Sequence, residues 1–212
     1  RGLRTSLMYT KSNENCRVIL VSSAGPGEGK TTTIANLAIT YANLGKKTVL
    51  IDSDLRKPVV HNIFNVDKSP GLTSYLSENE KDEKKLINKT NVNNLDVITS
   101  GVIPPNPSEL LDSPLLENLL NKLKKNYDVI LFDTPPLIAV TDAFVLMKYI
   151  TQFILVVRAG VTERVALDRV MTNVRQSGFK ESGVVLNALE ESHSYGAGYY
   201  YNYYQYYYAE NN

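Results

Sequence analysis

A glycine-rich segment over residues 24–32 combines residue types that can hold a phosphate group, and it reads Ala-Gly-Pro-Gly-Glu-Gly-Lys-Thr-Thr. Its glycines let successive backbone N–H groups point inward, and a helix that begins there contributes the positive end of its dipole. Lys30 would reach the β- and γ-phosphates of a nucleotide, and the Thr31 hydroxyl would bind Mg²⁺. The segment therefore predicts a Walker A loop that binds Mg-ATP, with alanine in place of the first glycine. The predicted cofactor contacts in the loop are Gly25, Gly27, Glu28, Gly29, Lys30, Thr31 and Thr32.

Carboxylates close two apolar runs further along the chain. Asp52 and Asp54 end one run, and Asp133 ends another, where it is followed by Thr-Pro-Pro. Because the carboxyl ends of parallel strands meet at one edge of a sheet, these acids should lie beside the phosphates. We expect them to hold Mg²⁺ together with Thr31, with Asp133 acting through water as a Walker B residue. The alternative for Asp52 and Asp54 is that they only cap a turn, one of them paired with Arg56.

The amino-acid composition of the segment 195–212 differs sharply from that of the rest of the chain. This segment holds nine of the 14 tyrosines, no lysine or arginine, and no aliphatic residue larger than alanine. A segment with so little to bury is expected to be a flexible tail, which leaves 1–194 as the folded domain. The predicted phosphoacceptors in this tail are Tyr199, Tyr200, Tyr201, Tyr203, Tyr204, Tyr206, Tyr207 and Tyr208.

A tyrosine acceptor needs help to lose its proton. Its hydroxyl has a pKa of about 10, so at neutral pH the formation of the nucleophilic phenolate costs roughly 4 kcal/mol of free energy. A carboxylate within hydrogen-bond distance lowers that cost by taking the proton. We assign Asp52 as this base and Asp54 to the metal, although the two roles could be exchanged. Lys30, Asp52 and Asp54 are thus the predicted catalytic residues.

Short apolar or β-branched runs alternate with segments of helical periodicity, which predicts parallel strands joined by helices. The runs are apolar almost throughout, as in a sheet that is covered on both faces. The predicted fold is therefore α/β and doubly wound, with a mainly parallel sheet. The predicted strands span 17–22, 48–52, 95–99, 128–132, 153–157 and 183–186.

Apolar stripes and end signals predict the helices that connect these strands. One stripe runs over 34–44 and is closed by Gly45, a second follows an N-cap at Ser113, and a third spans 167–174. The proline-rich stretch 104–108 is expected to be irregular throughout. It follows a predicted strand, so it is a candidate active-site loop.

Composition excludes some partners and leaves others open. The 212-residue chain has 23 basic and 22 acidic residues and a net charge of +1, so no overall field favours nucleic acid. The one cysteine, Cys16, cannot form an internal disulfide, which indicates a reducing compartment. No run approaches the roughly 20 apolar residues of a membrane span. Because the chain begins at Arg1 without a methionine, an upstream membrane anchor stays open.

Several of these features together resemble the bacterial tyrosine kinase family, over nearly the whole chain. They are the loop at 24–32, the Asp-x-Asp-x-Arg pattern at 52–56, the Asp-Thr-Pro-Pro of 133–136, the stretch 104–111 and the terminal tyrosine cluster. The resemblance implies a P-loop fold like that of partition and septum-site ATPases. It also implies that the subunits of a ring phosphorylate one another's tail tyrosines. In that family the nucleotide, Mg²⁺ and catalytic positions would be Lys30, Thr31, Asp52, Asp54 and Asp133.

The resemblance implies partners and a location as well. The homo-oligomer would be a ring, an octamer in the family, and a membrane polysaccharide co-polymerase would activate it in capsule or exopolysaccharide export. A phosphotyrosine phosphatase would reverse the reaction, and the protein would lie in the cytoplasm at the inner face of the cell membrane. Arg1 and Arg4 match two arginines of the family's ring contact, or else they are only solvated on a helix face. Asn187 would contact adenine, unless it only forms a turn.

Two other functions stay open on the sequence. The chain could be an ATP-driven switch that binds a partner without phosphorylating protein, or its tail could bind glycan or protein by aromatic stacking. Switches of the partition class usually carry a lysine five positions before the loop lysine, where this chain has Gly25. The sequence therefore favours a kinase over a switch.

Overall fold

The computed structural model describes Leu3 and residues 15–138, 142–179 and 182–189. The tyrosine-rich tail with its predicted phosphoacceptors lies outside these ranges, and so do Arg1 and Arg4. In the part of the chain that is described, no helix is long and apolar enough to cross a membrane.

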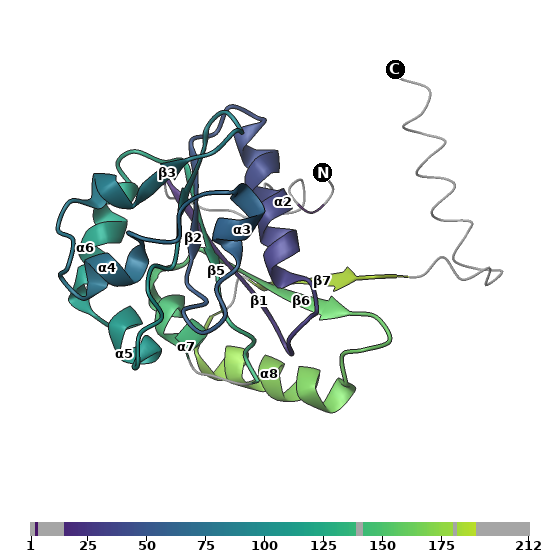
Figure 1. The fold of residues 1–212 in the computed structure, drawn as a ribbon. Helices are drawn as coiled ribbons and strands as arrows, with labels where there is room; N and C mark the ends of the chain where they lie inside the picture. Colours follow the sequence, from purple (N-terminus) through teal and green to yellow (C-terminus); the bar gives the residue numbers. More distant parts are fainter. Residues whose placement is uncertain (1–2, 4–14, 139–141, 180–181, 190–212) are drawn as a thin grey trace, which may run out of the picture.

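One sheet of seven strands runs through the domain in the order β3-β4-β2-β5-β1-β6-β7 (Figure 1). Each neighbouring pair in it is parallel except β3 with β4. The chain builds first one side of the sheet and then the other, which confirms the predicted doubly wound α/β fold. All six predicted strands are present, and the short antiparallel edge strand β3 was not predicted. The strands are β1 Arg17–Ser23, β2 Thr48–Asp52, β3 Ile87–Lys89, β4 Leu95–Ile98, β5 Val129–Asp133, β6 Gln152–Arg158 and β7 Ser182–Asn187.

The helix that follows β1 begins and ends close to its predicted bounds. α2 spans Lys30–Ala42 and begins after Gly29, whose φ of 94° is left-handed. It ends two residues before the predicted end at Leu44, although Gly45 has the expected positive φ of 78°. The other described helices are α3 Val60–Phe64, α4 Leu72–Leu76, α5 Pro107–Leu111, α6 Pro114–Leu123, α7 Asp142–Leu146 and α8 Arg164–Gln176, with 3₁₀ turns at Glu83–Leu86 and Met147–Tyr149.

Proline placement explains one confirmed and one wrong prediction. Helix α6 begins with Pro114 behind Ser113, whose side chain accepts a hydrogen bond from the N–H of Leu115 at 3.2 Å, as an N-cap should. The stretch 104–108 is irregular only as far as residue 106, because α5 begins at Pro107. Proline is tolerated at the first helical position, since its missing N–H would have no partner in the helix.

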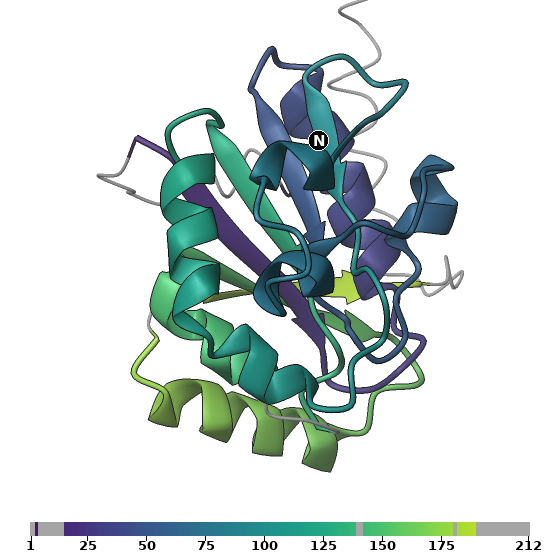
Figure 2. The same ribbon diagram turned by 60° about the vertical axis from the view of Figure 1, so that its left-hand side comes forward.

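The central strands are apolar because helices cover both faces of the sheet. The side chains of β1 alternate between two hydrophobic clusters, with Val18 and Leu20 in one and Ile19 and Val21 in the other. Residues of α4 to α8 complete the first cluster, and residues of α2 and α3 complete the second. Figures 1 and 2 show these helices in layers on the two sides of the sheet. The two cores together hold the carboxyl ends of β1, β2 and β5 side by side.

Leu119 on α6 is fully buried, whereas Leu44 after α2 is 48% exposed. We expect Leu119→Ala to lower the free energy of unfolding by about 2–5 kcal/mol, because the lost side chain leaves a cavity in the core. Leu44→Ala should change it by less than about 0.5 kcal/mol. Urea denaturation followed by circular dichroism measures both values. Similar losses in the two variants would contradict the assignment of the core.

Candidate active site

The phosphate loop leaves the carboxyl end of β1 and leads directly into α2. Gly27 and Gly29 have positive φ angles of 73° and 94°, which residues with a side chain adopt only with strain. A Cβ on Gly29 would also clash with the side-chain amide nitrogen of Asn187. The loop therefore has the local conformation that its glycines predict, at the N-terminus of a 13-residue helix where a phosphate can bind.

The side chain of Glu28, a predicted cofactor contact, turns into the protein and is only 3% exposed. Its Oε2 accepts the backbone N–H of Ala24 at 3.0 Å, and its Oε1 accepts the hydroxyl of Thr162 at 2.7 Å. The Asn187 side chain donates to the carbonyl of Glu28 at 3.0 Å. The carboxylate of Glu28 thus shapes the loop, and a contact from this residue to phosphate would have to come from its backbone.

Lys30 lies between two of the predicted acids. Its Nζ is 3.1 Å from Oδ2 of Asp54 and 3.5 Å from Oδ1 of Asp133. It also donates to the hydroxyl of Thr31 at 3.0 Å. Asp54 is 4% exposed and Asp133 is fully buried, so solvent ions screen these ion pairs only weakly. The structure brings these four side chains together at the edge of the sheet where the sequence predicts them.

Asp52 is adjacent to Asp133, because the two residues are in register on β2 and β5. It is fully buried, and its Oδ2 accepts the backbone N–H of Val60 at 3.1 Å. Burial, and secondly the negative charge of Asp133, raise the pKa of Asp52 to about 7. Burial also raises the pKa of Asp133 to about 6, although the charge of Lys30 opposes this shift. Two neighbouring carboxylates therefore titrate close to neutral pH.

The acids suit a magnesium ion that is shared with phosphate. Oδ1 of Asp52 and Oδ2 of Asp133 are buried and have no hydrogen-bond partner among the described residues. Such oxygens are the hard ligands that Mg²⁺ takes, usually one or two of them beside phosphate oxygens and water. No group of three or more acidic, histidine or cysteine side chains in the described ranges is arranged to hold a metal. Asp54, the third predicted acid ligand, pairs with Lys30 and accepts the backbone N–H of Lys57 at 3.0 Å. Its role as a metal ligand stays a prediction.

Sequence reasoning does not find two residues that contact the loop. Arg158 donates from Nη1 to the carbonyl of Gly27 at 3.1 Å, and Thr162 donates to Glu28. Arg158 ends β6, and Thr162 lies in the turn that follows it. Their position just after a predicted strand is the one signal in the sequence that could have pointed to them.

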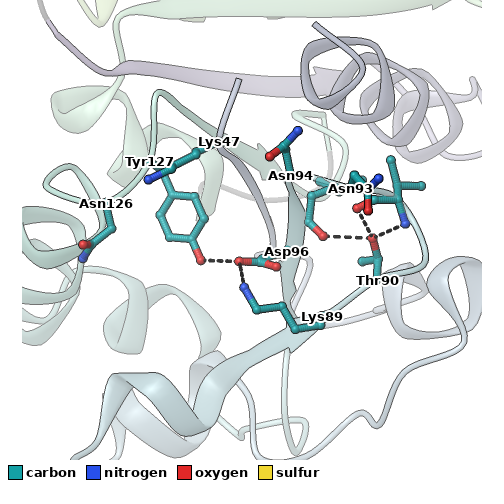
Figure 3. Close-up of a pocket in the computed structure, with 10 residues that line it drawn as sticks. Lys47, Lys89, Thr90, Asn93, Asn94, Asp96, Asn126 and Tyr127 are labelled. Atoms are coloured by element: carbon teal, nitrogen blue, oxygen red, sulfur yellow. Dashed lines mark hydrogen bonds and ion pairs between the residues drawn. The ribbon is translucent and has the colours of Figure 1, made fainter. Parts of the chain in front are cut away.

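A pocket of about 440 Å³ lies at the other edge of the sheet, where β2, β4 and β5 begin (Figure 3). Its polar groups bond to one another: Oδ2 of Asp96 accepts from Nζ of Lys89 at 2.8 Å and from the hydroxyl of Tyr127 at 2.7 Å. Burial, followed by the hydrogen bond to Asp96, raises the pKa of Tyr127. None of the phosphate-loop residues or of the three predicted acids lines this pocket, so we place the phosphate chemistry at the carboxyl edge.

Comparison with known proteins agrees with this site. A family model described as an AAA domain matches residues 16–159. The chain is 39% identical over 200 residues to the tyrosine-protein kinase YwqD of Bacillus subtilis, in a match that covers 94% of this chain and 84% of YwqD. The chain belongs to the bacterial tyrosine-protein kinase family.

Solved structures support the same family and fold. The kinase domain of the Escherichia coli tyrosine kinase ETK superimposes with a TM-score of 0.86 at 34% identity, covering 92% of this chain and 76% of that one. The cell division ATPase MinD of Pyrococcus furiosus gives a TM-score of 0.70 at 26% identity, covering 84% and 74%. The predicted kinase family and the predicted likeness to septum-site ATPases are both confirmed. The ligand assigned to each site residue stays a prediction.

The raised pKa of Asp52 predicts a pH-dependent effect on stability. The pKa of Asp52 is raised from 3.8, its ordinary value in a free side chain, to about 7 in the folded protein. Stability from the proton on Asp52 is therefore present at low pH and is lost as the pH rises through about 7, where the buried charge must form. Asp52→Asn removes that charge, so we expect it to raise the free energy of unfolding more at about pH 8 than at about pH 5.

Urea titrations without nucleotide at the two pH values measure this effect. Asp67→Asn is the control, because Asp67 is exposed. An Asp52→Asn gain that is no larger at the higher pH, or one that Asp67→Asn reproduces, would contradict the assignment.

Proposed function

We propose that this chain is an ATP-dependent protein-tyrosine kinase that phosphorylates the tyrosines of its own C-terminal cluster, in trans between subunits. The observation that carries the proposal is the meeting of Lys30 with Asp54 and Asp133 beside the phosphate loop. Membership of the tyrosine-protein kinase family supports the reaction. The acceptors in the proposal are tyrosines of 195–212, which holds nine of the 14 tyrosines in the chain.

In this proposal the loop backbone and Lys30 hold the β- and γ-phosphates at the start of α2. Thr31, Asp54 and Asp133 would hold Mg²⁺, Asp133 through water, and the bound ion would neutralise charge that develops on the phosphate oxygens. Asn187 is the proposed adenine contact. Its amide nitrogen already donates one N–H to the loop, so its second N–H and its amide oxygen remain for a base.

Transfer forms a bond between the tyrosine oxygen and the γ-phosphorus, breaks the bond to the leaving oxygen of ADP, and releases the phenolic proton to a carboxylate. Asp52 is the proposed base, because a pKa of about 7 lets it accept a proton near neutral pH. Asp52 is completely buried and Asp54 is slightly exposed, so an exchange of the two roles stays an alternative. The kinetics of Asp52→Asn and Asp54→Asn would distinguish the two assignments.

The cellular setting in the proposal comes from resemblance to the family. The subunits would form a ring, an octamer, in which Arg1 and Arg4 contribute to the contact. A membrane polysaccharide co-polymerase would activate the kinase, and a phosphotyrosine phosphatase would reverse the modification. The protein would act in the cytoplasm, at the inner face of the cell membrane, in the synthesis and export of capsular polysaccharide or exopolysaccharide.

Incubation with Mg-ATP followed by mass spectrometry tests the reaction. We expect phosphate on the tail tyrosines, and Lys30→Met should reduce its rate by at least about 100-fold, because the charge that stabilises the transferred phosphoryl is lost. Lys46→Met is a matched control, since Lys46 is exposed and precedes β2 at the other edge of the sheet. Release of ADP from a chain whose tyrosines stay unmodified would favour the ATP-driven switch instead.

Phosphorylation should also weaken self-association. Each phosphotyrosine carries nearly two negative charges. No lysine or arginine follows Lys180, and the acids after it are Glu181, Glu190, Glu191 and Glu210. A modified tail would therefore leave the acidic site of a neighbouring subunit. Light scattering on a sizing column should show a smaller oligomer after full modification and recovery after phosphatase treatment, and an unchanged or larger oligomer would contradict this expectation.

A further inference from the structure

The phosphate loop is hydrogen-bonded to a turn that is more than a hundred residues away in the sequence. This turn covers residues 158–162 and joins β6 to α8 (Figure 1). It is closed by hydrogen bonds from the N–H groups of Val161 and Thr162 to the carbonyl of Arg158, at 3.2 and 3.0 Å, and Gly160 has a positive φ of 71°. It is adjacent to the loop because β6 pairs with β1, with Val156 opposite Ser23.

Two side chains of the turn bond to successive residues of the loop. The guanidinium of Arg158 donates to the carbonyl of Gly27 at 3.1 Å, and the hydroxyl of Thr162 donates to the carboxylate of Glu28 at 2.7 Å. The same hydroxyl accepts the backbone N–H of Arg158 at 2.9 Å. Because its oxygen accepts that N–H, its single proton is free to be directed to Glu28.

The end of β7 completes this network. The side-chain amide of Asn187 donates to the backbone carbonyl of Glu28 at 3.0 Å. The backbone carbonyl of Asn187 accepts the N–H of Ala159 at 2.9 Å. The loop, the turn and the strand end are therefore joined by a continuous set of hydrogen bonds. Loss of a hydrogen bond to the Glu28 carboxylate should disturb this network most. Glu28 is only 3% exposed, and a buried carboxylate without its hydrogen bonds costs folding free energy.

We propose that Thr162 and Arg158 are positioning residues that hold the phosphate loop in the shape that binds nucleotide. The proposal rests on the nucleotide binding proposed above. The phosphate-binding groups of such a loop are backbone N–H groups, whose directions are set by the chain conformation at Gly27 to Gly29. A displacement of about 1 Å at such a site can reduce a rate by about 100-fold. Neither residue needs to touch the nucleotide for its loss to weaken binding.

Calorimetric titration of the full chain with Mg-ADP tests the proposal. Thr162→Val keeps the shape of the side chain and removes the hydroxyl, so we expect it to weaken Mg-ADP binding at least about 10-fold. Thr162→Ser keeps the hydroxyl and should stay within about twofold of the unsubstituted chain. Thr172→Val on the exposed face of α8 is the matched control and should bind normally. Rescue by serine distinguishes the hydroxyl's role in positioning from a loss of packing.

Arg158→Met is a second, independent variant, because Arg158 is exposed and its loss leaves the core intact. It should raise the KM for ATP with a smaller change in kcat, whereas Arg164→Met, at a side chain that is 93% exposed, should change neither. Normal Mg-ADP binding by Thr162→Val, or equal weakening by Thr162→Val and Thr162→Ser, overturns the positioning role alone. Failure of the unsubstituted chain to bind Mg-ADP overturns the proposed function, and this inference with it.

Discussion

The site depends on one electrostatic constraint, which is that buried carboxylates on neighbouring strands need a positive charge beside them. Asp52 and Asp133 are in register on adjacent strands, and both are fully buried. Lys30 is the cation that the structure places there, from the first turn of α2. Uncompensated charges in such a position are strongly destabilising, so the ammonium matters for folding as well as for phosphate. The ammonium of Lys30 and the carboxyl groups beside it make this edge of the sheet attractive to a triphosphate and its metal ion.

The parallel sheet is what lets residues so far apart in the sequence meet. The carboxyl ends of β1, β5 and β2 lie next to one another, which aligns the phosphate loop with the acids that follow the other two strands. A sheet of this kind must be covered on both faces, and the two hydrophobic clusters supply that cover. The acids are buried for the same reason, since they end strands that have no solvent-facing side. Their raised pKa values are thus a consequence of the architecture.

Those parts of the fold that have a strong local signal could be predicted from the sequence. The apolar runs of β2 and β5, the glycines before Lys30 and the cap at Ser113 each specify their structure through nearby residues. The five-residue helices α3 and α4 are too short to show a periodic stripe, and β3 exists because it pairs with β4.

In the site too, residues in local motifs could be predicted, whereas contacts between distant parts of the chain could not. Lys30, Thr31 and the acids belong to motifs, so their types and spacing identify them. The inward turn of Glu28 and its bond to Thr162 depend on β6 lying beside β1, which no local pattern reveals. The pairing of Asp54 with Lys30 likewise depends on α2 beginning close to the end of β2. Distances across the sheet, and not residue types, settle these contacts.

The hydrogen bond between Tyr127 and Asp96 bears on which tyrosines an enzyme of this kind can modify. Tyr127 belongs to the folded domain, and its proton is held by a carboxylate that is only 8% exposed. A raised pKa makes its phenolate scarcer than that of a free tyrosine, and a phosphate there would add nearly two negative charges against a buried one. At the amino edge of the sheet, charge would therefore oppose a phosphate on Tyr127.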